Sequence, residues 1–195
     1  SSLSLPGFGS KRRFDELSER EILALAISSE EEDGQIYAAY AARLRDQYPA
    51  TAQVFEDMAM VEDMHRRSLI ELYKKRFGDV ILPVRREHVA GYYTRSPVWL
   101  VENLGLERVR EEAEDMERSA HKFYVDAAKR TTDADTRKLL GDLAIAEAGH
   151  EKAVERSIAR HLGGEARGEE DAAAHRQFLL TWVQPGLAGL MDGSV

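Results

Sequence analysis

A carboxylate, a tyrosine and a Glu-x-x-His motif follow one another twice along this chain, in the same order. The members of the two copies are Glu30, Tyr37, Glu62 and His65, and then Glu117, Tyr124, Glu147 and His150. The three-residue spacing within each Glu-x-x-His motif places its two side chains on one face of a helix. Two such motifs with two further carboxylates form the ligand set that holds two iron or manganese ions in a four-helix bundle. The pattern therefore predicts a dinuclear metal site with bridging glutamate.

A single Glu-x-x-His motif is weak evidence for a metal, because it also arises by chance. Here both motifs occupy corresponding places in the repeat, and each follows an apolar stretch. These stretches contain Val54, Phe55, Met58 and Val61 in the first half, and Leu139, Leu140, Leu143 and Ile145 in the second. Buried carboxylates are destabilising without a counter-charge, and a bound metal supplies one. The competing interpretation, two exposed Glu–His pairs on solvated helices, leaves these apolar surroundings unexplained.

Several residues near the pattern have two interpretations each. Glu114 lies three residues before Glu117 on the same helical face, so it is a seventh candidate ligand, and the sequence leaves open which of the two bridges the metals. His121 either approaches the site or packs within the bundle. Tyr37 and Tyr124 either hydrogen-bond to ligand carboxylates from the opposite side of the site or are ordinary core aromatics.

Charge and cysteine content exclude several classes of protein. The chain has 195 residues and a formal charge of −8, which disfavours nucleic acid as a partner. It contains no cysteine, so any metal must be held by carboxylates and imidazoles. Glu31 and Glu32 form either a solvated face or an acidic approach for cations. No signal peptide and no apolar stretch of membrane-spanning length are recognisable.

Apolar residues recur at spacings of three and four, which predicts helices almost throughout. Residues 18–21 read Ser-Glu-Arg-Glu and predict a capping box that opens the first helix. This helix should end near Pro49. Thr51 is the expected cap of a second helix that stops at Gly78.

The stretch 79–104 breaks the helical pattern and predicts a crossover with a short helix near 98–102. A third helix is expected over 106–130, and Thr132 or Asp133 should cap a fourth that ends near 163. A last helix is expected near 171–183. These elements predict an all-α four-helix bundle with a long crossover between the second and third helices and an extra C-terminal helix.

The same elements suggest three parts of the chain. Residues 1–13 are expected to be a flexible N-terminal tail, and residues 14–165 a single di-metal domain. Residues 166–195 should form the C-terminal helix and a juxtamembrane linker that leads to a transmembrane domain.

The repeated pattern resembles the rubrerythrin branch of the ferritin-like superfamily, and the similarity covers residues 15–163. It implies a ferritin-like fold with a di-iron site held by the glutamates and histidines of the repeat. Two departures stand out. Ala120 occupies the position where rubrerythrins usually carry a second glutamate, and no cysteines are present to form a rubredoxin-type iron site. Peroxidase turnover through such a site is therefore not expected.

Residues 184–195 resemble the opening of the transmembrane domain of vacuolar iron transporters. Together the two resemblances point to the membrane-bound ferritins, which are erythrin–vacuolar iron transporter fusions. They imply a homodimer on the cytoplasmic side of a bacterial inner membrane, which binds two Fe ions, or Mn, and supplies or gates iron export. Oxidation of Fe²⁺ by O₂ or H₂O₂ would make the domain a ferroxidase-type oxidoreductase. The alternatives are a non-catalytic sensor or delivery module for the transporter and a purely structural dimerisation module.

Overall fold

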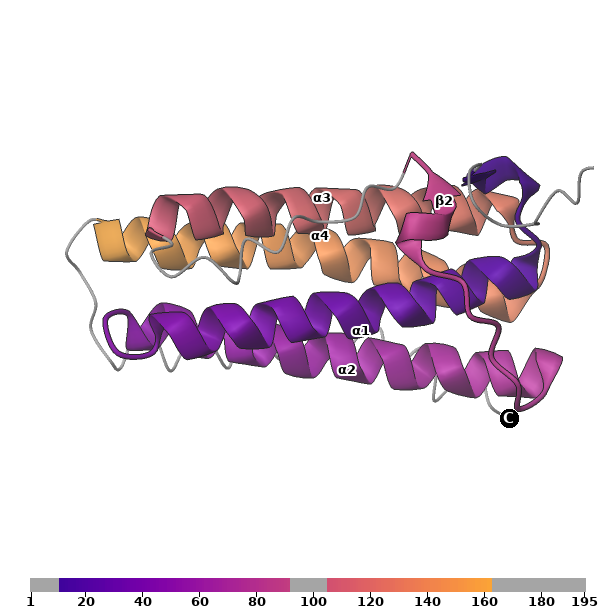
Figure 1. Ribbon diagram of the computed structural model, residues 1–195, viewed down its shortest axis with the longest axis horizontal. Helices are drawn as coiled ribbons and strands as arrows, with labels where there is room; N and C mark the ends of the chain where they lie inside the picture. Colours follow the sequence, from indigo (N-terminus) through magenta and orange to yellow (C-terminus); the bar gives the residue numbers. More distant parts are fainter. Residues whose placement is uncertain (1–10, 92–104, 163–195) are drawn as a thin grey trace, which may run out of the picture.

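Four long helices form most of the computed structural model, which describes residues 11–91 and 105–162. Helices α1 (Glu19–Leu44) and α2 (Pro49–Phe77) form one pair, and α3 (Leu106–Arg130) and α4 (Ala134–Leu162) form the other (Figure 1). The two pairs pack side by side with their axes nearly aligned, and the long connection runs from α2 to α3. This arrangement confirms the predicted all-α four-helix bundle. Within the described ranges no helix combines the length and apolar character needed to cross a bilayer.

Local capping interactions set the start of α1 and α4. The hydroxyl of Ser18 accepts a hydrogen bond from the Glu21 backbone N–H at 3.2 Å, and the Glu21 carboxylate accepts one from the Ser18 N–H, so the predicted capping box is present. At α4 the carboxylate of Asp133 accepts bonds from the backbone N–H and the hydroxyl of Thr136, at 3.0 and 2.7 Å. Asp133 is therefore the cap that the sequence left undecided between two residues.

The prediction for the start of α2 was wrong. The helix begins at Pro49, two residues before Thr51, and Thr51 is buried within its first turn. Proline is well suited to the first helical position because its φ angle is already helical and its missing N–H would have no partner there. The end of α2 follows the prediction, since Gly78 adopts φ 88°, a conformation that favours glycine.

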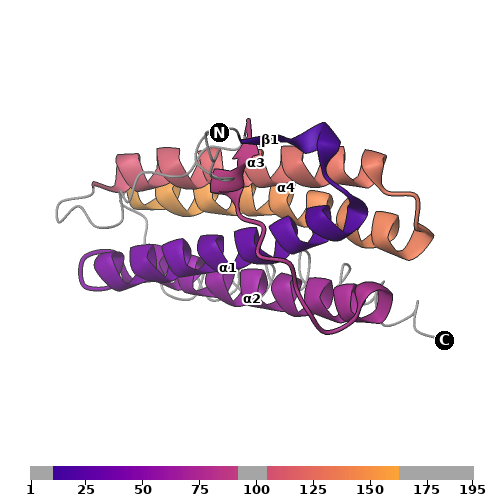
Figure 2. The ribbon, with the colours of Figure 1, turned by 45° about the vertical axis from the view of Figure 1, so that its right-hand side comes forward.

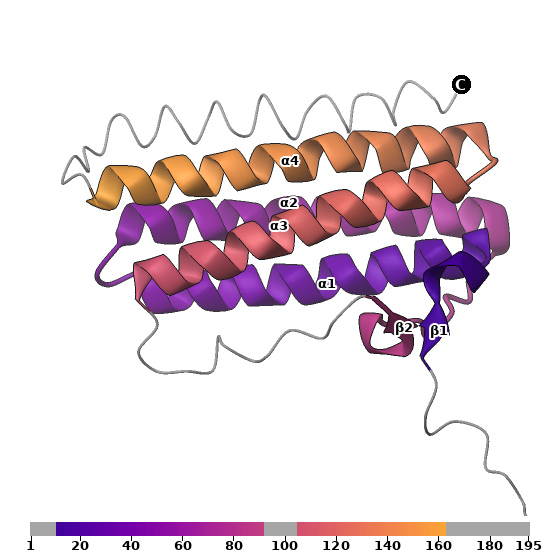
Figure 3. The same cartoon turned by 90° about the horizontal axis from the view of Figure 1, so that it is seen from above.

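Two short strands lie outside the bundle and were not predicted. Strand β1 (Arg12–Arg13) pairs in parallel with β2 (Val89–Ala90), beside the short helices η1 (Phe14–Glu16) and η2 (Arg86–His88). The pair lies outside the bundle beside α1 and α3, on the side away from α4 (Figures 2 and 3). It joins the end of the expected N-terminal tail to the crossover. The expected helices at 98–102 and 171–183 lie outside the described residues.

A layer of polar side chains divides the interior into two apolar clusters. On each helix, the residues on one side of the polar layer belong to the first apolar cluster, and the residues on the other side belong to the second. On α1, for example, residues 22–27 belong to the first cluster and Ile36, Tyr37 and Tyr40 to the second, with Glu30 between them. The apolar clusters therefore hold the polar layer at the same level on all four helices.

Candidate metal centre

The polar layer contains six of the seven residues predicted to bind metal. All six are buried, with at most 5% of their surface exposed. They form two groups whose ligand atoms lie within 4.8 Å of one another: Glu30, Glu62, His65 and Glu147 in the first, and Glu62, Glu117, Glu147 and His150 in the second. The structure thus brings both copies of the sequence pattern to one place.

The two groups share two carboxylates. Glu62 and Glu147 belong to both groups, whereas each group has its own histidine, His65 or His150. The two imidazole rings are nearly parallel, with 6° between their planes and 5.9 Å between their centroids. Such a pseudo-symmetric arrangement could hold a cation in each of two neighbouring groups, with Glu62 and Glu147 common to both.

Each histidine faces carboxylates from both helix pairs. The Nδ1 atom of His65, on α2, lies 3.6 Å from Glu147 Oε1 and 3.7 Å from Glu30 Oε2. The Nδ1 atom of His150, on α4, lies 3.5 Å from Glu62 Oε1 and 3.4 Å from Glu117 Oε2. Ligand atoms from all four helices therefore converge on the same small volume.

Several of these buried atoms form no hydrogen bond to any other residue that the structure describes. They are Glu30 Oε2, Glu62 Oε1, His65 Nδ1, Glu117 Oε2 and Glu147 Oε1. A buried polar atom without a partner is destabilising by about 1–3 kcal/mol, and more if it is charged. Divalent cations between the carboxylates would give all five a partner at once. Hard oxygen donors together with imidazole nitrogen suit iron or manganese, so the residues present fit a di-metal centre.

Two tyrosines connect the halves of the repeat. The hydroxyl of Tyr37, on α1, donates to Glu117 Oε1 on α3, and the hydroxyl of Tyr124, on α3, donates to Glu30 Oε1 on α1. Both tyrosines are buried. Each hydrogen bond fixes one oxygen of a carboxylate and leaves the second oxygen turned toward the cluster. This is the role expected of groups that orient metal ligands.

We expect the double variant Tyr37→Phe and Tyr124→Phe to fold and to bind metal about 10–100-fold more weakly, because its two carboxylates lose the bonds that orient them. Isothermal titration with Mn²⁺ measures the change. Tyr73→Phe is the matched control, since the Tyr73 hydroxyl accepts from Arg20 Nε and donates to the Val80 carbonyl, away from the cluster. Equal affinities of the double variant and this control would contradict an orienting role.

The carboxylates raise the pKa of both histidines. Burial alone would lower the pKa of His65, but its contacts with Glu147 and Glu30 raise it to about 9. For His150, burial is again opposed, here by Glu117 and Glu147, and the pKa rises to about 10. A metal must displace these protons before it can bind the imidazoles, so binding releases protons.

The clustered carboxylates also shift one another. Burial and the neighbouring negative charge of Glu147 raise the pKa of Glu62 and of Glu117 well above the ordinary value. Burial would raise the pKa of Glu147 too, but its close contacts with Glu117, His150 and His65 lower it well below that value. The environment of the cluster favours bound positive charge, whether protons or a metal.

Two sequence candidates lie elsewhere. Glu114 belongs to neither group, and its partly buried carboxylate accepts a hydrogen bond of 3.0 Å from Arg110 on the same helix. The Nδ1 atom of His121 lies 2.8 Å from the carbonyl oxygen of Ala144, so this histidine packs between α3 and α4.

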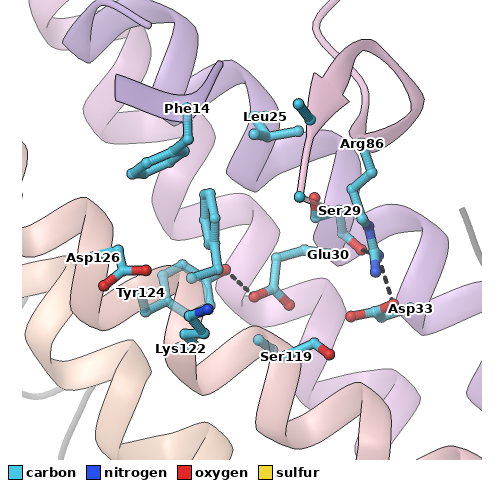
Figure 4. A pocket seen from close by; sticks show the side chains of 14 residues that line it. Phe14, Leu25, Ser29, Glu30, Asp33, Arg86, Ser119, Lys122, Tyr124 and Asp126 are labelled. Carbon is cyan, nitrogen blue, oxygen red and sulfur yellow. Dashed lines mark hydrogen bonds and ion pairs between the residues drawn. The ribbon is translucent and has the colours of Figure 1, made fainter. Parts of the chain in front are cut away.

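Sequence reasoning missed a buried ion pair beside the cluster. Nη2 of Arg86 donates to Asp33 Oδ1 at 2.6 Å and to the Ser29 carbonyl at 2.8 Å (Figure 4). Asp33 could have been found, because it lies three residues after Glu30 on α1. Arg86 gave no signal, since it belongs to a connection without periodicity.

A four-helix bundle with a long second connection and a buried cluster of carboxylates and histidines is a ferritin-like domain. The model of the Rubrerythrin family matches residues 21–158, and the chain belongs to the rubrerythrin family. A solved structure of a hypothetical protein from Pyrococcus furiosus is similar, with a TM-score of 0.64 and 20% sequence identity. The similarity covers 79% of this chain and 96% of that chain, and it concerns the fold. The search of curated proteins gave no match.

Proposed function

We propose that this domain binds two Fe²⁺ ions in the cluster, with Mn²⁺ as the alternative metal. The observation that carries the proposal is the pair of overlapping four-residue groups, in which buried oxygen and nitrogen atoms have no hydrogen-bond partner among the described residues. Four carboxylates balance the charge of two divalent cations, which removes the repulsion that the cluster otherwise contains. Rubrerythrin-family membership supports iron as the metal.

The structure supports a distinct role for each pair of ligands. Glu62 and Glu147 would bridge the two metal positions because both groups contain them. His65 and Glu30 would complete the first position. His150 and Glu117 would complete the second, and Tyr37 and Tyr124 would hold the two outer carboxylates in place.

The proposed activity is oxidation of Fe²⁺ to Fe³⁺ with O₂ or H₂O₂ as the electron acceptor. Iron supplies this redox chemistry when bound, and the chain contributes a buried cluster of carboxylates whose negative charge favours the higher oxidation state. Storage or delivery of Fe²⁺ without oxidation would use the same ligands. The two functions therefore differ in the rate of Fe²⁺ oxidation and not in the binding of Fe²⁺.

We further propose that the domain serves iron export on the cytoplasmic side of a membrane. This part rests on the resemblance of residues 184–195 to the opening of a vacuolar iron transporter, and these residues lie outside the described part of the chain. A homodimer of the domain belongs to the same proposal.

The test combines binding with rate. Anaerobic titration of the protein with Fe²⁺ should give two bound ions per chain, and stopped-flow absorbance after mixing with O₂ or H₂O₂ should show oxidation faster than in protein-free buffer. Binding of two ions without faster oxidation would identify a delivery module. A protein that binds no Fe²⁺ would overturn the proposed function.

A further inference from the structure

A pocket of about 430 Å³ opens between α1 and α3 (Figure 4). Its lining includes Phe14 of η1 and Arg86, together with Ala90 at the end of β2 and the following Gly91. At about 30 Å³ for each water molecule, this volume holds roughly 14 waters. The pocket therefore has room for a divalent cation that keeps its first layer of water.

The inner end of the pocket is formed by a residue of the metal centre. Of the six residues of the cluster, only Glu30 lines this pocket. One of its oxygens accepts the hydrogen bond of Tyr124, which also lines the pocket (Figure 4). The other oxygen lies 3.7 Å from His65 Nδ1. A movement of the Glu30 side chain alone would carry a bound cation from the pocket into the cluster.

The charges in the pocket suit a cation. Arg86 is the buried positive group, and its charge is balanced by Asp33 at 2.6 Å and by Glu32 at 3.8 Å. This leaves two carboxylates, those of Glu30 and Asp126, against one ammonium group, that of Lys122. Lys122 is exposed, and its long side chain can keep the charge in water.

Arg86 also holds the wall of the pocket in place. Its two hydrogen bonds reach the Ser29 carbonyl and Asp33, which bracket Glu30 on the same turn of α1. The guanidinium thus ties the crossover to the helical turn that carries Glu30, and it forms part of the pocket lining beside that turn.

We propose that this pocket is the access route for divalent cations, with Asp126 near its mouth and Glu30 receiving the ion at its inner end. The inference rests on the proposed metal binding by the cluster. It predicts that the residues of the pocket control how fast metal reaches the cluster and leave unchanged how much metal binds at equilibrium.

The experiment measures loading of the metal-free protein with Co²⁺ by stopped-flow visible absorbance, with stoichiometry from equilibrium titration. Ala120→Trp places an indole in the pocket, and we expect it to slow loading by about tenfold or more, a barrier increase of at least about 1.4 kcal/mol. Lys129→Trp, an exposed substitution on the same helix, is the control and should load like the wild type. Both variants should bind two ions.

A charge variant tests the same inference without filling the pocket. Asp126→Lys should slow loading at low ionic strength and lose most of this effect in high salt, because salt screens the added charge. Glu71→Lys, an exposed change on α2, is its control. Equal loading rates in both pocket variants and their controls, at full stoichiometry, would overturn the access route. Unchanged Co²⁺ loading with slower Fe²⁺ oxidation by H₂O₂ would also overturn it and assign the pocket to the oxidant. Absence of Co²⁺ binding in the wild type would instead overturn the proposed function.

Discussion

Replacing Glu62 and Glu147 together with glutamine should abolish binding of both metal ions, with an affinity loss of more than about 100-fold. These two carboxylates belong to both groups of ligand atoms, so no metal position survives their loss. Removing a residue that only supports a ligand already weakens metal binding by about 10–100-fold, and loss of two charged ligands should exceed that. Glutamine keeps the size of the side chain, which separates the loss of charge from a loss of packing.

The double variant should remain folded, because glutamine keeps the size of both side chains and the apolar clusters on either side are unchanged. Its melting temperature without metal should fall below that of the wild type at pH 7, because the Glu147 carboxylate no longer stabilises the protonated imidazoles of His65 and His150. Glu114→Gln is the matched control, since Glu114 lies on α3 outside both groups. Titration with Mn²⁺ and elemental analysis give the stoichiometry. Two bound ions in the double variant would show that the metal binds elsewhere.

The metal-free domain should lose stability as the pH rises from 7 to 10. The pKa values of His65 and His150 are raised from 6.5 to about 9 and about 10, so their stabilising protons are fully bound below pH 6.5. These protons are released as the pH rises through 9 and 10, and the contribution to stability is lost there. For His65 this amounts to roughly 3 kcal/mol.

The glutamates mostly act in the same direction. The raised pKa values of Glu62 and Glu117 mean that the folded state also binds their protons more tightly, and these protons are lost as the pH rises. Glu147 has the opposite effect. Because its pKa is lowered in the folded state, its contribution to stability is present at pH values above the ordinary carboxyl pKa and is lost only as the pH falls below that value. Glu62 and Glu117 therefore add to the loss of stability that the two histidines cause between pH 7 and 10, and Glu147 does not oppose it there.

We expect the melting temperature of the metal-free protein to fall by roughly 10 °C over this range, given about 2–4 °C for each kcal/mol. With Mn²⁺ bound the fall should be smaller, because metal replaces the protons and binds better as they leave. His65→Asn with His150→Asn should remove most of the difference, while His121→Gln, outside the cluster, should retain it. Thermal unfolding followed by circular dichroism measures all four. A metal-free melting temperature that is constant or rises between pH 7 and 10 would contradict the assigned charges.

Helical periodicity explains why much of this molecule could be predicted. The positions of Glu30, Glu62 and Glu117 follow from a repeat in which each helix carries its ligands between two apolar stretches, and apolar packing sets the level of those ligands. Glu114 shows the limit of this reasoning. Three residues correspond to 300° around a helix, so Glu114 and Glu117 differ by about 60°. That difference is enough for one to enter the core while the other pairs with Arg110.

The remaining differences arise where tertiary contacts decide the conformation. Strands of two residues, such as β1 and β2, leave no alternating pattern, and their pairing depends on how the crossover folds back over α1. The Arg86–Asp33 ion pair joins residues that are far apart in sequence, and neither has a spacing that identifies the other. Thr51 is of a residue type that often caps helices, but α2 begins two residues earlier, at Pro49.

The most direct measurement is anomalous X-ray diffraction from crystals of the protein loaded with Fe²⁺ without oxygen, and from a second set loaded with Mn²⁺. We expect two neighbouring peaks at the absorption edge of the metal, both between Glu62 and Glu147, one beside His65 and the other beside His150. No peak in the bundle, or peaks confined to surface carboxylates, would contradict a di-metal centre in this chain.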